Sequence, residues 1–172
     1  MKLHRITAIF LRQVFLIVKN KVRIVGIFYW SLLDLLVWGF ITVYFTQVSN
    51  ASIIGALLAA AILWNFFIRV QQGVLVSFLE DVWARNFINL FASPLSIGEY
   101  IAGNIITSLA TNTLVLTALF SLAWLLFAYN IFTLGLLLIP YIAILLVFGT
   151  ALGIVTVSLV LRFGPASEWF GW

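Results

Sequence analysis

Residues 131–161 read "IFTLGLLLIPYIAILLVFGTALGIVTVSLVL", a run without one charged side chain. A helix needs about 20 apolar residues to cross the hydrocarbon core of a bilayer, so this run is long enough to span one. Only helices and closed barrels satisfy their own backbone groups in lipid. The run is far longer than the roughly 10-residue alternating strand of a membrane barrel. It therefore predicts a transmembrane helix.

The composition of the whole chain leads to the same class of protein. Of its 172 residues, 65% are hydrophobic and 8% are charged, whereas a soluble domain has about 45–50% and about 25%. A soluble fold of this length has too little interior to hide so many apolar side chains. The chain has no cysteine, which excludes disulfides and Cys-ligated metals. We expect an all-α membrane protein that forms a single transmembrane domain over residues 1–172, with the lipid bilayer as its solvent.

Four apolar runs separated by polar connections predict four transmembrane helices. Their expected bounds are 24–46, 53–79, 97–128 and 131–161. The first half of the third run carries several Asn, Ser and Thr residues, so we expect that half to pack on other helices or to line a wet cavity. Pro140 is expected to kink the fourth helix.

The distribution of basic residues predicts the orientation in the membrane. Six of the nine basic residues precede residue 24, namely Lys2, Arg5, Arg12, Lys19, Lys21 and Arg23. Clustered Lys and Arg mark the cytoplasmic side of a membrane protein rather than a nucleic-acid-binding surface. With four spans, Arg85 and Arg162 fall on that same side, and Arg69 is expected to reach toward the headgroups there. The sequence thus predicts a multi-pass protein of the plasma (inner) membrane with a cytoplasmic N-terminus.

Residues 1–23 have the pattern of an amphipathic helix that lies in the headgroup layer. Lys2, Arg5, Arg12, Lys19 and Arg23 recur at sums of three and four residues and so share one face. A basic face with an apolar reverse suits the surface of an anionic leaflet. The alternative is a charged flank that only sets the orientation.

Residues 78–94, "FLEDVWARNFINLFASP", interrupt the apolar sequence between the second and third runs. Residues 80–94 predict a short amphipathic helix on the cytoplasmic membrane surface, which Pro94 ends. Its apolar face would carry Trp83, Phe87, Leu90 and Phe91, and its polar face would carry Asp81, Arg85 and Asn89. The polar face is either a docking surface for another protein or part of an ordinary connector.

The stretch "FLEDVWARNFINLFASPLSIGEYIAGNII" resembles the cytoplasmic loop of ABC-2-type transporter permeases. The matching positions are Glu80, Arg85, Leu90, Ser93–Ser96 and Glu99–Tyr100. The run "YWSLLDLLVWGF" is similar to the first span of some permeases in that family, and "LRFGPASEWFGW" is similar to the stretch that leads into their fifth span. The resemblance therefore extends along nearly the whole chain.

The resemblance implies a permease subunit of an ATP-binding-cassette exporter, which forms the membrane path as a homo- or heterodimer. Residues 80–94 would be the coupling helix that contacts a separate cytoplasmic ATP-binding subunit, with Glu80, Asp81, Arg85 and Asn89 as candidate contacts. Members of the family have more spans, so residues 162–172 are expected to begin a fifth segment. No G-x-x-x-x-G-K-[ST] run occurs in the sequence, so ATP hydrolysis is expected in the partner chain. We expect no catalytic, cofactor or metal site.

Asp34 is the acidic residue in the middle of a predicted span, and a charge there costs about 2.5–3.5 kcal/mol. It either contacts a substrate or proton, or forms hydrogen bonds to another helix, near Asn65 or Trp38. Asp34, Asn65 and Arg69 are the candidate intramembrane polar site.

Gly149 and Gly153 form G-x-x-x-G, which lets helices approach closely either within the chain or in a dimer. The alternative function is an ATP-independent channel, carrier or scaffold subunit. A membrane enzyme is disfavoured because neither H-E-x-x-H nor G-x-S-x-G occurs.

Overall fold

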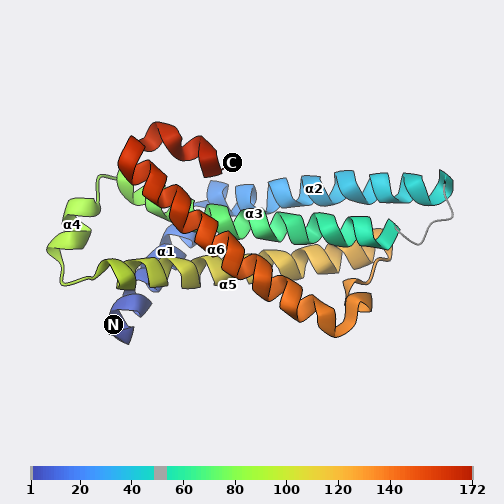
Figure 1. Ribbon diagram of the computed structural model, residues 1–172, viewed down its shortest axis with the longest axis horizontal. Coiled ribbons are helices and arrows are strands. Elements are labelled where there is room, and N and C mark those ends of the chain that lie inside the picture. The colour runs from blue at the N-terminus through green and yellow to red at the C-terminus, as the bar shows by residue number, and fades with distance from the viewer. Residues whose placement is uncertain (1, 49–53, 172) are drawn as a thin grey trace.

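The computed structural model describes residues 2–48 and 54–171, and within these ranges the protein is built from helices without a strand. The elements in chain order are α1 (Leu3–Lys19), α2 (Lys21–Val48), α3 (Ile54–Trp83), α4 (Phe87–Ala92), α5 (Ile97–Phe127), the 3₁₀ segment η1 (Ile131–Leu137), α6 (Leu138–Phe163) and the 3₁₀ segment η2 (Pro165–Gly171). Figure 1 shows the long helices side by side, with α6 crossing the others obliquely.

Four segments are long and apolar enough to cross a membrane: Lys21–Gln47, Gly55–Trp83, Ile97–Phe127 and Ile131–Phe163. The helices α2, α3, α5 and α6 have 28, 30, 31 and 26 residues. At about 1.5 Å per residue they are roughly 39–47 Å long, which exceeds the roughly 30 Å of a hydrocarbon core. The protein is therefore an all-α membrane protein with several spans.

Helix α3 is the centre of the bundle and packs against α2, α5 and α6. In its most apolar stretch 56% of the residues are buried, against 17% in α2 and 11% in the segment 131–163. Leu58, Ile62, Val70 and Leu75 are almost completely buried along α3. The apolar side chains of α2 and α6 instead face outward, where in a membrane they meet lipid.

The two glycines of the G-x-x-x-G motif lie where α6 crosses α3. A Cβ added at Gly149 would lie 3.0 Å from Val70 Cγ1, and one at Gly153 would lie 2.9 Å from the backbone oxygen of Gln71. The motif thus makes a close contact within the chain, which is one of the two alternatives that its sequence left open.

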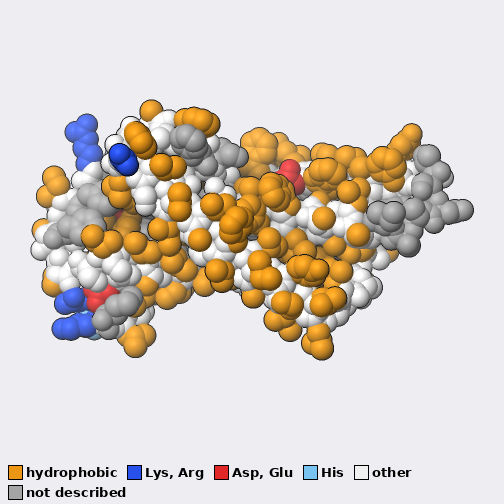
Figure 2. Space-filling view, viewed as in Figure 1, with side chains coloured by type: hydrophobic (Ala, Val, Ile, Leu, Met, Phe, Trp, Pro, Cys, Tyr) orange, Lys and Arg blue, Asp and Glu red, His pale blue; other side chains and the backbone are white. Residues whose placement is uncertain are grey.

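The N-terminus, α1, α4 and the last turn of α6 lie at the same end of the bundle, while η1 and the start of α3 lie at the other (Figure 1). Figure 2 shows basic side chains at the first end and an apolar surface over most of the rest of this face. We call the first end the charged end. The start of α1, the end of α6 and the connection between α3 and α5 therefore lie at one end of the bundle.

Several expected boundaries were wrong. Residues 1–23 do not form one helix, because α1 ends at Lys19 and α2 already begins at Lys21. The helix expected over 80–94 is much shorter, since α3 continues through Trp83 and α4 has only six residues. Ser93 has an extended backbone before Pro94, and this ends α4 as expected.

The kink expected at Pro140 is also absent from that position. The chain bends at Gly135, whose φ of 60° is in the region that favours glycine. Pro140 lies in the first turn of α6, where a missing backbone N–H removes no helical hydrogen bond. Residues 165–171, in the stretch expected to begin a fifth segment, form η2 and fold back onto α6 and α3.

Candidate functional site: a charged end and a polar cavity

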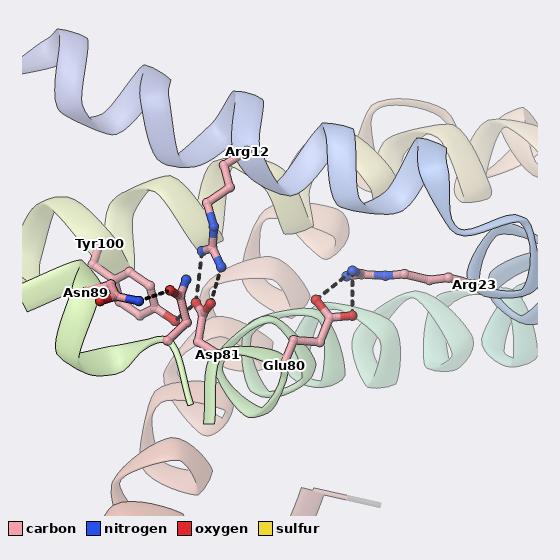
Figure 3. A network of polar contacts seen from close by, with 7 residues as sticks. Arg12, Arg23, Glu80, Asp81, Asn89 and Tyr100 are labelled. Carbon is pink, nitrogen blue, oxygen red and sulfur yellow. Dashed lines mark hydrogen bonds and ion pairs between the residues drawn. The ribbon is translucent and has the colours of Figure 1, made fainter. Parts of the chain in front are cut away.

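A buried ion pair joins the N-terminal helix to the end of α3. Both terminal nitrogens of Arg12 donate to the carboxylate of Asp81, one of them at 3.1 Å from Oδ2. The hydroxyl of Tyr100 donates to the same oxygen at 2.7 Å. Asp81 is completely buried, and the hydrogen bond to its carboxylate is the main cause that raises the pKa of Arg12 above its ordinary value. Figure 3 shows Arg12 and Tyr100 converging on Asp81 from α1 and α5.

Two further ion pairs connect the N-terminal segment to the same region. Arg23 at the start of α2 contacts both carboxylate oxygens of Glu80 at 2.6 Å (Figure 3). Glu99 accepts from the backbone nitrogen of Lys2 at 2.7 Å and from Arg5 at 3.4 Å. Glu99 also forms a capping box with Ser96 at the start of α5. Three acidic residues of α3 and α5 are thus each paired with an arginine from the first 23 residues.

These contacts change the interpretation of the N-terminal basic face. Arg5 and Arg12 share one side of α1, as their spacing predicts, but with Arg23 of α2 they pair with acids of α3 and α5 instead of facing the surroundings. Lys19, expected on the same face, is exposed. The side of α1 that faces away from the bundle carries Leu11 and Phe15, whose side chains are 47% and 63% exposed. In a membrane this outer side of α1 would contact apolar material.

The four candidate coupling residues fall into two pairs. Glu80 and Asp81 belong to the last turns of α3 and bond to α2 and α1, so neither lies on a common polar face with the other two. Arg85 and Asn89 are exposed, and within the described part of the chain Arg85 has no ion pair. The expected single polar face was wrong because α3 extends into the stretch that was expected to start a separate helix.

A tight turn separates α3 from α4 and exposes the short helix. Arg85 has a φ of 51°, and the backbone nitrogen of Asn86 donates to the carbonyl of Asp81 at 3.0 Å. Ile88 on α4 is 82% exposed, and Trp83 before the turn is 60% exposed. Leu90 packs toward the bundle. The side chains of Phe87 and Phe91, expected on the apolar face, lie outside the described part.

A polar cavity of about 720 Å³ lies between α2, α3 and α5. Its polar lining comprises Arg23, Asp34, Asn65, Arg69, Gln72, Ser77, Thr107, Ser108, Thr111 and Asn112. From Arg23 to Asp34 the cavity follows α2 for roughly 16 Å, about half of a hydrocarbon core. It opens sideways, because Trp30 and Asp34 line it and are also exposed. The polar first half of α5 contributes to the lining of this cavity. Lining a cavity was one of the two roles that the sequence predicted for it.

The candidate intramembrane residues Asp34, Asn65 and Arg69 meet in this cavity through one hydrogen-bond network. Asn65 Nδ2 donates to Asp34 Oδ2 at 2.8 Å, and Asn65 Oδ1 accepts from Ser31 Oγ at 2.9 Å. Arg69 Nε donates to Ser31 Oγ at 2.6 Å. Arg69 therefore bonds through Nε to α2, and its reach toward the headgroups stays a prediction.

Sequence reasoning did not anticipate Arg12, Arg23, Ser31 and Tyr100 as partners of the acidic and amide groups. The capping box did have a sequence signal, because Ser96 and Glu99 have the S-x-x-E spacing that precedes a helix. The ion pairs had a weaker sequence signal, because the predicted topology placed Glu80, Asp81 and Glu99 on the same side of the membrane as the N-terminal arginines. Within residues 2–48 and 54–171 no three acidic or histidine side chains are grouped so that they could hold a metal ion.

Comparisons with protein-family models, curated proteins and solved structures found no match for this chain.

Proposed function

We propose that this chain is the permease subunit of an ABC-2-type exporter and that α4 docks on a separate cytoplasmic ATPase. The observation that carries this proposal is the position of α4. It is a short surface helix between the two long helices α3 and α5, at the charged end, with Ile88 82% exposed. Arg85 and Asn89 are exposed beside it. An apolar anchor flanked by polar groups is the usual make-up of a protein-docking surface.

The contacts around α4 give a route by which docking could reach the membrane interior. Glu80 lies on the last turns of α3 and pairs with Arg23, and Arg23 lines the polar cavity. Asp81 ties the same turn of α3 to α1 and α5. A displacement of α4 would therefore act on three helices at once, because these contacts connect the end of α3 to α1, α2 and α5.

The proposed orientation puts the charged end in the cytoplasm of a cell with a plasma (inner) membrane. Lys and Arg residues are concentrated there, and the positive-inside rule relates such an excess to the cytoplasmic side. ATP is available in that compartment. As in the family that the sequence resembles, the working unit would pair two permease subunits with two ATPase subunits.

The test uses the ATPase with a phosphate-binding loop that a neighbouring reading frame is expected to encode, co-expressed with this chain and reconstituted in liposomes. Arg85→Glu is expected to reduce the stimulation of ATP hydrolysis by this chain, because Arg85 is exposed and free to contact the partner. Arg162→Glu is the matched control, since Arg162 is also exposed near the charged end but lies on α6. Glu80 is unsuitable for this test because its reversal would break the pair with Arg23.

Unchanged stimulation of ATP hydrolysis in the double variant Arg85→Glu with Ile88→Asp would contradict the docking role of α4.

The second candidate function, an ATP-independent carrier, is favoured by one observation: Asp34 and Arg69 line a cavity inside the bundle, and ionisable groups inside spans often mark transport pathways. A carrier would move its substrate in liposomes without any ATPase, whereas the proposed permease would not.

A further inference from the structure

We propose that the polar cavity binds an amphiphile with a zwitterionic headgroup. A phosphate or carboxylate would lie against Arg69, a primary ammonium would lie against Asp34, and the apolar tail would leave sideways past Trp30 into the bilayer. This inference concerns binding alone and does not depend on the proposed coupling to an ATPase.

Two charged side chains in the cavity, Arg69 and Asp34, have atoms that can bind a ligand. Arg69 uses Nε to bond Ser31, and its two terminal amino groups have no hydrogen-bond partner within the described ranges. Asp34 uses Oδ2 to accept from Asn65, and its other oxygen has no partner there either. A charge in a membrane interior is costly unless it is paired. The cavity thus offers a ligand the two terminal amino groups of the Arg69 guanidinium and one carboxylate oxygen of Asp34.

The separation of these two charges favours a headgroup that has two charges of its own. Among the described residues no ion pair joins Arg69 to Asp34, although both belong to one hydrogen-bond network through Ser31 and Asn65. The network holds the two charges in fixed positions on neighbouring helices. A headgroup with opposite charges at its two ends can pair with both. A purely anionic headgroup would pair with Arg69 but would be repelled by Asp34.

The size and the lateral opening of the cavity suit an amphiphilic ligand. Its volume of about 720 Å³ lies within the roughly 300–1,000 Å³ of ordinary ligand sites. Ile27, Ile68 and Val76 supply apolar walls, and Trp30, at 64% exposure, lies at the lateral opening. Charged groups along the wall and Trp30 at the lateral opening suit a molecule with a polar head and a hydrocarbon tail.

The experiment measures binding of tail-labelled phosphatidylethanolamine, phosphatidylcholine and phosphatidylglycerol to the purified full chain in detergent. We expect the ethanolamine lipid to bind most tightly. The choline lipid is expected to bind more weakly because its trimethylammonium group cannot donate a hydrogen bond to Asp34. Soluble glycerophosphoethanolamine separates the two possible sources of the headgroup: competition at equal concentration would indicate a free phosphoamine ligand, and absence of competition a lipid.

Three cavity variants and one control distinguish the roles. Arg69→Gln should weaken all three lipids, by about tenfold for one lost charge-assisted hydrogen bond. Asp34→Asn should remove the preference for ethanolamine over glycerol headgroups, because it weakens the ethanolamine lipid and removes the repulsion of the glycerol lipid. Thr111→Phe should block every lipid because it fills the cavity and keeps both charges. Arg162→Gln, which removes an arginine outside the cavity, should change nothing.

Equal affinity of the unmodified chain for ethanolamine and glycerol lipids would overturn the proposal, and that measurement needs no variant to fold. Tight binding that Thr111→Phe leaves intact would also overturn it, because the lipid would then occupy another surface. Failure of either kind leaves the docking of α4 unaffected, and failure of the ATPase test leaves this binding site unaffected.

Discussion

Arg12 of α1 and Asp81 of α3 form a buried ion pair across 69 residues of sequence. Tyr100 of α5 completes it, so that three helices meet at one carboxylate. The pair lies at the charged end, in the last turn of α3, and α4 begins six residues after Asp81, at Phe87. The position suggests that Asp81 fixes the geometry from which α4 projects.

Removing one partner of this pair should destabilise the fold strongly. Asp81→Ala leaves the partly exposed guanidinium of Arg12 without its counter-ion, so the loss should stay below about 3–5 kcal/mol, the cost of breaking a fully buried pair. Tyr100→Phe removes one hydrogen bond to Asp81 and should cost about 1–3 kcal/mol. Both changes can be measured as the free energy of unfolding in detergent titrated with a denaturing surfactant.

The control for this prediction is the double variant Arg12→Met with Asp81→Leu. Replacing a whole buried pair by apolar groups is often close to neutral, so the double variant should be more stable than Asp81→Ala. If the losses in the single variants Arg12→Met and Asp81→Leu add up to the loss in the double variant, the two side chains do not act as a pair.

The sequence predicted the architecture well because the membrane restricts the possible folds. Long apolar runs of the required length are helical in lipid, so the four spans followed from hydropathy with boundaries within a few residues. The boundaries that were wrong lie where polar sequence remains helical. Glu80 and Asp81 were placed outside the second span because they are charged, but their pairing with arginines lets α3 continue to Trp83.

The candidate sites were predictable only in part. The charge of Asp34 inside a span indicated that it needs a partner, and Asn65 was one of the two residues named for it. The roles of Ser31 and Arg12 were not predictable, because the rotation of one helix against another depends on packing of the whole bundle. The spacing of the basic residues predicted that Arg5 and Arg12 lie on one side of a helix, but it predicted neither the break at Asn20 nor that this side faces α3 and α5.

The contact of α6 with α3 should be sensitive to the size of the residue at position 153. Gly153→Ala would bring a Cβ to 2.9 Å from the backbone oxygen of Gln71, and backbone cannot move aside as a side-chain end can. We expect a loss of about 1–3 kcal/mol, the range for overpacking a core. Gly149→Ala should cost less, since its nearest neighbour is a methyl group of Val70 at 3.0 Å.

Gly26→Ala is the matched control for these two variants. Gly26 also lies inside a long helix, but a Cβ added there meets nothing within 4 Å. The substitution should be neutral or stabilising by about 0.5–1 kcal/mol, because alanine favours helix. An equal loss at all three positions would argue against close packing of α6 on α3. The measurement is again the free energy of unfolding in mixed detergent.

Gln13 should be replaceable with a gain in stability. Its side chain is fully buried on α1, and neither its amide nitrogen nor its amide oxygen has a hydrogen-bond partner within the described residues. A buried polar group left unsatisfied costs about 1–3 kcal/mol, so Gln13→Met should raise the free energy of unfolding by about that amount. The same change at the exposed Gln47 should have little effect, and a loss at Gln13 would mean that its amide is bonded in the membrane.

Single cysteines can test the topology, because the chain has none of its own. With the charged end in the cytoplasm, an impermeant maleimide should label Asn89→Cys and His4→Cys only after the cells are opened. Thr133→Cys, in η1 at the opposite end, should be labelled in intact cells. Ile144→Cys, 64% exposed within the apolar segment 131–163, should react from neither side, because the reactive thiolate does not form in hydrocarbon. Labelling of positions 4 and 89 from opposite sides would contradict both the four-span arrangement and the docking of α4, since an ATPase could not then reach the helix from the compartment that holds the N-terminus.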